Sequence, residues 1–343
     1  MLNVALTGRE TRFRPIREVD YRALRLLTER SIGSSPLKVE RQVRALDKAW
    51  RQGRLGYPAE EPTDWQWRMC EARMVLGDYS DWRGWEYRSE WAAGLWFNPE
   101  GSWQGQRVDR LCVLGEQGIG DEVCFAQALL DIRDKVGAIE FQTDPRLVGV
   151  IGRMGVEAVP ALFVDGVRKF KAPEIPWIPL GDLLRNFRRS LSQFPRKPYI
   201  TALPEQVERF KAYRGRVGVS WRGAQGSYPL SEFASLVAAP VGLQYDLAWD
   251  EEVETPDLDL RNDVEGLLGI LSNLDRLVTV STSLAHFAGA LGVKTDLILA
   301  PMNGVRKNML PFKWLCEAMP GQTPWYGPHV RVFRNLREYR ASL

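Results

Sequence analysis

Apolar and polar positions follow a repeating two-part pattern from about residue 105 onward. Short apolar runs of strand character alternate with longer stretches in which apolar residues return every three or four positions, the spacing of a helix. Such an alternation predicts parallel strands with helices packed on them, the α/β class of fold. The first series of expected elements comprises strands at 110–114, 139–142, 156–159 and 177–180, with helices at 122–135 and 145–154.

A second series follows the proline-rich segment 194–200, which we interpret as a linker. Because the same pattern returns after it, we predict two α/β domains, at 105–200 and 201–343, preceded by a helical region at 1–104. The second series comprises strands at 217–221, 276–280, 295–299 and 330–333, a further strand ending at 243–245, and helices at 231–238, 263–271 and 312–316.

The region 1–104 is predicted to consist mainly of helices and turns, with helices at 21–30, 38–54 and 64–76. Basic residues crowd the span 22–54, which would suit a nucleic-acid or protein partner, but interleaved acids such as Glu40 and Asp47 favour an ordinary solvated helix surface. The aromatic-rich segment 72–91 is spaced like the second half of a tetratricopeptide repeat. Its rings could stack on sugars, although aromatics at helical spacing are more typical of a core.

Composition indicates a soluble globular chain, with 343 residues, 45% of them hydrophobic, and a formal net charge of +3. That charge is too small to indicate nucleic-acid binding by the whole chain. No apolar run is long enough to span a membrane, and the arginine-rich start lacks the apolar segment of a signal peptide. We therefore expect neither export nor membrane insertion.

Four cysteines lie without CxxC spacing, which favours buried free thiols in a reducing, cytoplasmic compartment. Only His286 and His329 are present, so a site of histidine and cysteine metal ligands is not expected, and we predict no bound metal. Asp257-Leu-Asp259 imitates a metal-binding DxD motif, but it falls between predicted elements and is interpreted as an acidic loop.

The segment 111–130 reads as strand, glycine turn and helix, with Gly115, Gly118 and Gly120 in the turn. Glycines let a ligand's phosphate or sugar approach the backbone, and the helix start offers free N–H groups to an anion. The spacing matches neither the GxGxxG dinucleotide fingerprint nor a Walker A loop. Asp121, placed where the helix begins, is either a helix cap or a carboxylate aimed at a ligand.

A second candidate turn lies at 281–286, after a buried strand. Ser281, Thr282 and Ser283 bring hydroxyls to a helix start and His286 brings an imidazole, which together could hold a diphosphate without a metal. The alternative is an ordinary Ser/Thr cap with His286 packed as a hydrogen-bonded core residue. Two such turns at the carboxyl ends of facing sheets would let one hold a leaving diphosphate while Asp121 accepts a proton from an attacking hydroxyl.

The chain resembles bacterial and phage tetratricopeptide-type glycosyltransferases, which are related to heptosyltransferases and more distantly to O-linked N-acetylglucosamine transferases. The resemblance covers about residue 72 to the end, and its phrases occur in family order. These phrases are Gly84-Trp-Glu-Tyr-Arg88, Glu116-Gln-Gly-Ile-Gly-Asp-Glu122, Asp144-Pro-Arg-Leu147, Gly218-Val-Ser-Trp-Arg-Gly223, Leu243-Gln-Tyr245, 280–292 and 324–333.

This resemblance implies a GT-B fold, two Rossmann-like domains facing across a cleft, and an inverting, metal-independent glycosyltransferase with no permanently bound cofactor. The donor would be a nucleotide sugar. The acceptor stays open among a saccharide, a protein and a DNA base, and a protein partner would bind through the basic N-terminal helices. By position, Asp121 matches the catalytic base, and His286 lies in the segment that grips the donor diphosphate. The other matched site residues are Gly118, Gly120, Trp221, Arg222, Gly223, Gln244, Tyr245, Ser281, Thr282 and Ser283.

Three phrases depart from the family pattern. Gly226-Ser227-Tyr228 lacks the usual basic residue, Ser281 replaces a common aspartate, and Phe312-Lys313-Trp314 replaces Trp-Arg-Trp. These departures motivate a first alternative, a binding or structural protein that kept the fold and lost the chemistry. The basic span 22–54 motivates a second, a sugar transferase acting on DNA bases.

Overall fold

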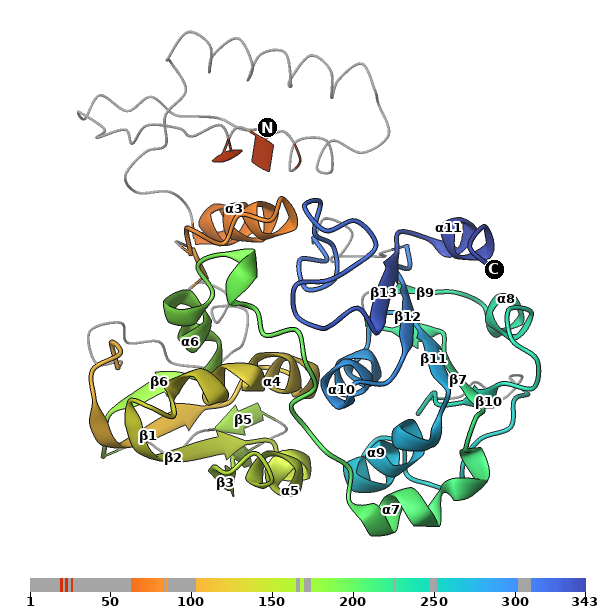
Figure 1. Cartoon of the computed structure of the whole chain (residues 1–343), viewed down its shortest axis with the longest axis horizontal. Coiled ribbons are helices and arrows are strands. Elements are labelled where there is room, and N and C mark those ends of the chain that lie inside the picture. Colours follow the sequence, from red (N-terminus) through yellow and green to blue (C-terminus); the bar gives the residue numbers. More distant parts are fainter. Residues whose placement is uncertain are drawn as a thin grey trace, which may run out of the picture.

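The chain folds around two parallel β-sheets that lie next to each other, with helices packed on them (Figure 1). This arrangement comes from a computed structural model. The predicted helix at 38–54, most of the one at 21–30, and residues 83 and 86–91 of the tetratricopeptide-like segment lie outside the described residues, so the tetratricopeptide-like interpretation stays a prediction. The structure describes residues 19–20, 22–23, 26, 63–82, 84–85, 103–164, 167–169, 174–224, 226–246, 252–301 and 310–343.

The first sheet has the strand order β3-β2-β1-β6, and all its pairings are parallel. The four strands confirm the four expected ones, and the predicted helix at 122–135 is a helix that begins earlier, at Ile119, and tightens to a 3₁₀ turn after Ala126. An antiparallel hairpin, β4 with β5, was not anticipated. The elements are β1 (Val108–Leu114), α4 (Ile119–Ala126), η2 (Gln127–Ile132), β2 (Val136–Thr143), η3 (Pro145–Leu147), α5 (Val148–Gly152), β3 (Glu157–Pro160), β4 (Leu162–Val164), β5 (Val167–Lys169), β6 (Trp177–Pro179) and α6 (Leu180–Phe187).

The second sheet has the order β10-β7-β11-β12-β13 and is also entirely parallel. Its connections include helices on both faces, as a parallel sheet requires. The elements are η4 (Leu191–Gln193), α7 (Pro204–Arg209), η5 (Lys211–Tyr213), β7 (Val217–Ser220), β8 (Arg222–Gly223), β9 (Gly226–Ser227), α8 (Leu230–Ala234), β10 (Val241–Gly242), α9 (Val264–Asn273), β11 (Arg276–Thr279), α10 (Ser283–Leu291), β12 (Thr295–Ile298), β13 (Val330–Phe333) and α11 (Leu336–Arg340).

Alternation along β11 divides the apolar side chains of the second sheet between two cores. Val278 belongs to a compact cluster formed with residues of α8 and α11, whereas Leu277 belongs to the larger cluster formed with α9 and α10. That larger cluster continues through α4 into the first sheet and into α3 (Thr63–Val75). The two sheets therefore share one continuous apolar core.

Aromatic side chains fix the chain that follows α3 to the first sheet. Trp82 donates from Nε1 to the Arg188 carbonyl at 2.8 Å, and Trp85 donates to the Gly181 carbonyl at 2.9 Å. Both indole rings are buried. Helix α3 confirms the helix expected at 64–76, and the burial of these rings confirms that they belong to a core.

The expected helix at 312–316 is wrong, because only one turn forms there. The Lys313 carbonyl, which would accept the hydrogen bond that continues a helix, instead accepts one from Thr323 Oγ1 at 2.6 Å. The N–H of Glu317, four residues on, donates to Val75 of α3 at 2.7 Å. Tertiary partners thus replace the helical ones.

The segment expected to link the domains, 194–200, is free of regular structure but well packed. Its Tyr199 hydroxyl donates to the Val123 carbonyl of α4 at 2.7 Å, and its backbone N–H bonds to Ala290 of α10 at 2.9 Å. The linker therefore joins the two helices that lie where the sheets meet. Among the described residues, no helix has both the length and the apolar composition that a membrane crossing requires.

Candidate functional site

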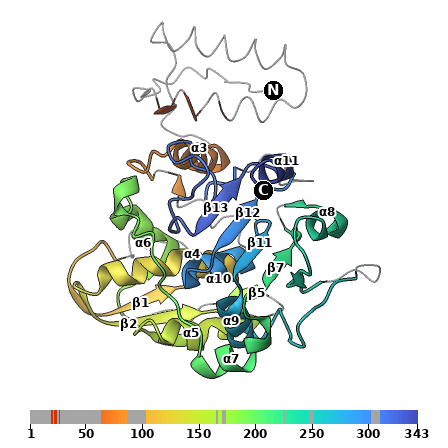
Figure 2. The same cartoon turned by 45° about the vertical axis from the view of Figure 1, so that its right-hand side comes forward.

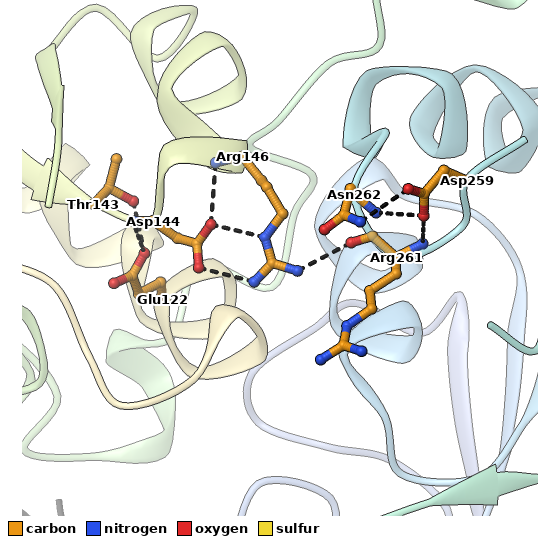
Figure 3. Close-up of polar contacts among 7 residues, drawn as sticks. All are labelled: Glu122, Thr143, Asp144, Arg146, Asp259, Arg261 and Asn262. Carbon is orange, nitrogen blue, oxygen red and sulfur yellow. Dashed lines mark hydrogen bonds and ion pairs between the residues drawn. The ribbon is translucent and has the colours of Figure 1, made fainter. Parts of the chain in front are cut away.

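The turn after β1 is organised by a buried carboxylate, Glu122, which is 0% exposed. Its Oε1 accepts a hydrogen bond from the Glu116 N–H at 3.0 Å, while Oε2 accepts from Thr143 Oγ1 at 2.6 Å and from the Asp144 N–H at 3.0 Å. Figure 3 shows the Thr143 hydroxyl reaching Glu122. A single side chain therefore ties the β1 turn to the end of β2. Nothing in the local pattern around Glu122 distinguishes it from an ordinary acid in a first helical turn.

Gly115 is required by the approach of this carboxylate. A Cβ atom on Gly115 would lie 2.0 Å from Glu122 Oε1 and 2.8 Å from the Gln142 carbonyl oxygen. Neither neighbour can withdraw, since one is held by three hydrogen bonds and the other belongs to β2. The first glycine of the turn thus serves the fold of the turn itself.

Gly120 is the point where the two candidate turns meet. A Cβ atom added to it would lie 3.0 Å from His286 Cδ2 and 3.2 Å from Ser283 Cα. Helices α4 and α10 pack side by side between the sheets, as both views show (Figures 1 and 2). The structure therefore brings together the two turns that the sequence places 160 residues apart.

Both helices begin without a side-chain cap. Gly118 at the N-cap of α4 has extended backbone angles, and Thr282 at the N-cap of α10 makes no capping hydrogen bond. The Thr282 Oγ1 atom is buried and without a hydrogen-bond partner among the described residues. Ser281 Oγ accepts from Trp314 Nε1 at 2.8 Å. Uncapped helix starts leave N–H groups and a partial positive charge for an anion.

His286 is packed rather than open to solvent, at 5% exposure. Its Nδ1 is 2.8 Å from the Tyr326 hydroxyl, and its ring stacks on Trp314 with centroids 4.4 Å apart. Burial, reinforced by the nearby Lys313 ammonium, lowers the pKa of His286 well below its ordinary value. The imidazole is therefore neutral, and it corresponds to the packed alternative of the two interpretations that the sequence leaves open.

Asp121 forms an ion pair with Lys313, whose ammonium reaches it from the segment after Pro311. The Asp121 side chain is 30% exposed and that of Lys313 is 16% exposed. The ammonium also lies 5.4 Å from the ring centroid of Phe125. Burial disfavours the charged ammonium, but the Asp121 carboxylate, together with Cys124 and Glu116, raises the pKa of Lys313. The sequence marks Lys313 only as a departure from the family phrase, with no sign of this pairing.

Trp221 and Gln244 are buried within the second domain. Trp221 is 0% exposed in the compact core beneath α8 and α11. Gln244 Oε1 accepts from Ser220 Oγ at 3.0 Å and from the Arg222 N–H at 3.1 Å, and Nε2 donates to the Arg222 carbonyl at 3.1 Å and to Asp246. These four bonds exhaust the hydrogen-bonding groups of its amide. Their role is to hold the Arg222 backbone just after β7, and the assignment of Trp221 and Gln244 to a donor site stays a prediction.

Arg222, Ser281 and Tyr245 follow three neighbouring strands, β7, β11 and β10, at the carboxyl edge of the second sheet. The register pairs Ser220 with Thr279 and Val219 with Gly242, so the three strands end within one residue of the same level. The Arg222 side chain is held by Asp246, through the carbonyl and at 3.7 Å from Oδ1. The next residue, Gly223, lies so close to Ser281 that a Cβ atom would be 2.6 Å from its carbonyl oxygen.

Tyr245 is the exposed member of this edge, at 57% exposure. The Arg261 guanidinium carbon lies 5.8 Å from the centroid of its ring. Arg261 is itself fixed from the first sheet, because Arg146 Nη1 donates to its carbonyl at 3.0 Å (Figure 3). Asp144 orients Arg146 through Nε and Nη2, at 2.8 and 2.9 Å. A polar chain thus runs from Glu122 to the edge of the second sheet.

The acidic loop at 257–259 has an internal structural role. Asp259 accepts hydrogen bonds from the backbone N–H groups of Arg261 and Asn262, both at 3.0 Å, and from the Asn262 amide at 2.9 Å, as Figure 3 shows. Within the described part of the chain, no group of three or more histidine, cysteine, aspartate and glutamate side chains is arranged to hold a metal. Cys70, Cys112, Cys124 and Cys316 are buried free thiols, as expected.

No protein-family description matches the chain. Protein FlbA of Caulobacter vibrioides is 26% identical, over 78% of this chain and 54% of FlbA, so the chain spans about half the length of that curated relative.

Solved structures with a similar arrangement include a glycosyl transferase of family 9 from Veillonella parvula, with a TM-score of 0.44 and 10% identity over 70% of this chain and 89% of that one. ADP-heptose LPS heptosyltransferase II of E. coli gives a TM-score of 0.38 and 13% identity over 65% and 90%. The iron-containing dodecameric glycosyltransferase TibC of enterotoxigenic E. coli gives 0.38 and 12% over 66% and 63%. These structural neighbours are glycosyltransferases, but with TM-scores below 0.5 the functional argument depends on the site itself.

Proposed function

We propose that this chain is a GT-B-type glycosyltransferase that moves a sugar from a nucleotide-sugar donor to an acceptor hydroxyl with inversion and without a metal. The observation that carries the proposal is the contact of Gly120 with Ser283 and His286. It places Asp121, the next residue of α4, beside the uncapped start of α10. A carboxylate that can accept a proton and a site that can hold an anion are then neighbours.

The donor diphosphate is proposed to lie at the start of α10. Backbone N–H groups there point along the helix axis toward the anion, and the hydroxyls of Ser281, Thr282 and Ser283 add further donors. Preorganised donors of this kind stabilise the charge that develops on a departing diphosphate. Arg222, which follows β7, the strand next to β11, adds a cation at the same edge.

The nucleobase is proposed to stack on Tyr245. Parallel strands are about 4.8 Å apart, so the ends of β10 and β11, which precede Tyr245 and Ser281, lie about 10 Å apart. This separation suits a nucleoside diphosphate whose base and phosphates occupy opposite ends of the edge. Tyr245 offers an exposed ring, and Arg261 on its face can stack on or bond to the base.

The proposed chemistry is a single displacement. The acceptor oxygen forms a bond to the anomeric carbon while the bond from that carbon to the diphosphate oxygen breaks, and the acceptor proton passes to Asp121. The leaving diphosphate keeps the electron pair of the broken bond. His286 is neutral and buried, so we assign it a positioning role: it holds Trp314, which in turn bonds Ser281.

A binding protein without catalysis is the second candidate. The pairing of Asp121 with Lys313 favours it, because the ammonium occupies the carboxylate that would have to receive the acceptor's proton. The DNA-modifying alternative depends on the basic span 22–54, which lies largely outside the described residues.

The test begins with thermal unfolding of the full chain in the presence of ADP, GDP, UDP and CDP. A nucleotide that binds the folded state raises the melting temperature with its concentration. Tyr245→Ala should weaken that binding by about 10-fold to 100-fold, the loss expected for one base–aromatic stack. Tyr213→Ala is the matched control, because Tyr213 also packs with an arginine but precedes β7 at the opposite edge.

Asp121→Asn distinguishes transfer from binding. It should abolish sugar transfer from the nucleotide sugar identified in this way, while nucleotide binding persists. Turnover retained in Asp121→Asn would refute the assignment of the base. Binding without transfer in the wild type would favour the second candidate, and no binding by any of the four nucleotides would refute the donor site.

A further inference from the structure

We propose that Lys313 is the cation that binds the donor diphosphate, and that it occupies two positions: on Asp121 in the free chain and on the diphosphate in the donor complex. Donor binding would then uncover the carboxylate that accepts the acceptor's proton. The inference rests on the proposed function, since it assigns a residue and an order of events to the same site.

The backbone of Lys313 is fixed against the diphosphate turn by its neighbours. Trp314, the next residue, donates to Ser281 Oγ at 2.8 Å and stacks on His286. The Lys313 carbonyl accepts from Thr323 Oγ1 at 2.6 Å. The backbone of Lys313 therefore lies beside the turn at 281–286, which is proposed to hold the donor. Its ammonium instead pairs with Asp121, in the turn that begins α4.

The ammonium lies where an anion at the start of α10 would compete for it. Its charge acts on His286, which lies in the first turns of α10, strongly enough to help lower the pKa of that imidazole. Gly120, the residue before Asp121, lies against the start of α10, because an added Cβ atom would be 3.2 Å from Ser283 Cα and 3.0 Å from His286 Cδ2. A lysine side chain has a flexible four-carbon stem and three donors, which allows the ammonium to move between neighbouring anions.

Charge favours the transfer once the donor is present. A diphosphate brings more negative charge than one carboxylate, and in a partly buried site the pairing is stronger than in water. The Asp121 carboxylate and the diphosphate compete for Lys313, and by thermodynamic linkage each weakens the binding of the other to Lys313 by the same factor. Removing the Asp121 charge should therefore strengthen diphosphate binding, whereas removing the Lys313 charge should weaken it.

The experiment measures, by isothermal titration, the affinity of the full chain for whichever of ADP, GDP, UDP and CDP stabilises it most. Lys313→Met keeps a long side chain over Phe125 and removes the charge. We expect it to weaken diphosphate binding by about 10-fold to 100-fold, as for the loss of one charge-assisted hydrogen bond. Lys313→Arg should restore most of the affinity. The corresponding nucleoside, which lacks phosphate, should bind wild type and Lys313→Met equally.

Lys294→Met is the matched control. Lys294 also pairs with an aspartate, at 3.4 Å from Asp275 Oδ1, but it precedes β12 at the opposite edge of the sheet. Its substitution should leave diphosphate affinity unchanged. Asp121→Asn should raise diphosphate affinity by about 1.5-fold to 5-fold, the worth of the partly exposed ion pair that is released.

The outcomes separate this inference from the proposed function. If the wild type binds none of the four nucleotides, the proposed function fails. If the wild type binds and Lys313→Met binds equally well, the assignment of Lys313 is wrong while the donor site stands. If Lys313→Met binds the diphosphate more weakly but Asp121→Asn does not bind it more tightly, Lys313 binds phosphate and the exchange with Asp121 is refuted.

Discussion

Glu122→Gln tests whether a buried carboxylate builds the turn that carries Asp121. In the described part of the chain, the two Glu122 oxygens accept hydrogen bonds from the N–H groups of Glu116 and Asp144 and from the hydroxyl of Thr143. Oxygens that act only as acceptors match the ionised carboxylate. Glutamine has nearly the same shape, but one of its two terminal atoms is a donor, so it cannot accept at both positions.

The expected cost follows from the better of the two amide orientations. With the amide oxygen toward Thr143 and Asp144, two bonds survive, and the NH₂ group faces the Glu116 N–H, which is 3.0 Å from the acceptor in the wild type. One hydrogen bond to a charged acceptor is lost, at about 1.5–3 kcal/mol, and an N–H is left unpaired. Removing the buried charge offsets part of this loss. We therefore expect the free energy of unfolding to fall by about 2 kcal/mol.

The assay is urea unfolding followed by circular dichroism, with Glu157→Gln as the matched control. Glu157 pairs with Arg110 on the same sheet at 2.6 Å, but its side chain is 54% exposed, so its loss should cost less than about 0.5 kcal/mol. Thr143→Val should lower the free energy of unfolding less in the Glu122→Gln background than in the wild type, because the two side chains share one hydrogen bond. Equal costs for Glu122→Gln and Glu157→Gln would refute the reasoning.

Three further changes probe the contact between the turns. Gly120→Ala should destabilise the fold by about 1–3 kcal/mol in chemical unfolding, because its Cβ would meet the fixed His286 ring. Gly152→Ala is the control and should not destabilise the fold, because a Cβ there has nothing within 4 Å. Equal effects of the two substitutions would contradict this reasoning. Folding lowers the pKa of His286, so below pH 6.5 the unfolded chain takes up a proton that the folded chain does not. This group should therefore reduce the wild-type free energy of unfolding by about 1.4 kcal/mol for each pH unit below that value. His286→Asn should lose that component, so its stability deficit should shrink on acidification, and a constant deficit would be inconsistent with a neutral imidazole. Arg153→Met should cost about 1–2 kcal/mol in the same unfolding assay, since it removes a bidentate pair with Glu265 at 2.7 and 2.8 Å that joins the two sheets, and no loss would exclude such a brace.

The strands were predictable from sequence because buried parallel strands are nearly continuous apolar runs. β13 (Val330–Phe333) lies where its run predicts, and β1 extends its predicted run by two residues. Short elements without such a run were missed: the hairpin of β4 and β5, and α7, although Pro204 at its first turn is a recognised start signal.

The candidate site was predictable in its backbone and less so in its side chains. Glycine and hydroxyl turns after strands identify both helix starts, because the need for close approach is local. The contacts that a side chain makes, in contrast, depend on residues that are distant in the sequence. Whether His286 packs or projects depends on Trp314 and Tyr326, which follow it by 28 and 40 residues.

The same limit applies to Glu122 and Lys313, whose partners come from other strands or from the far end of the chain. Glu122 could have been found by noting that Thr143 and Asp144 end the neighbouring strand, where their donors face the same turn. For Lys313 no comparable signal exists, because the expected helix at 312–316 would have directed the residue elsewhere.

The most direct measurement of the central claim is a crystal structure of the chain with a bound nucleoside diphosphate. The account predicts phosphate oxygens at hydrogen-bond distance, about 2.7–3.2 Å, from the N–H groups that begin α10, with the base against Tyr245 and the Lys313 ammonium moved off Asp121 onto the phosphates. A nucleotide bound elsewhere, or one whose phosphates point away from Ser283 while Lys313 stays on Asp121, would contradict it.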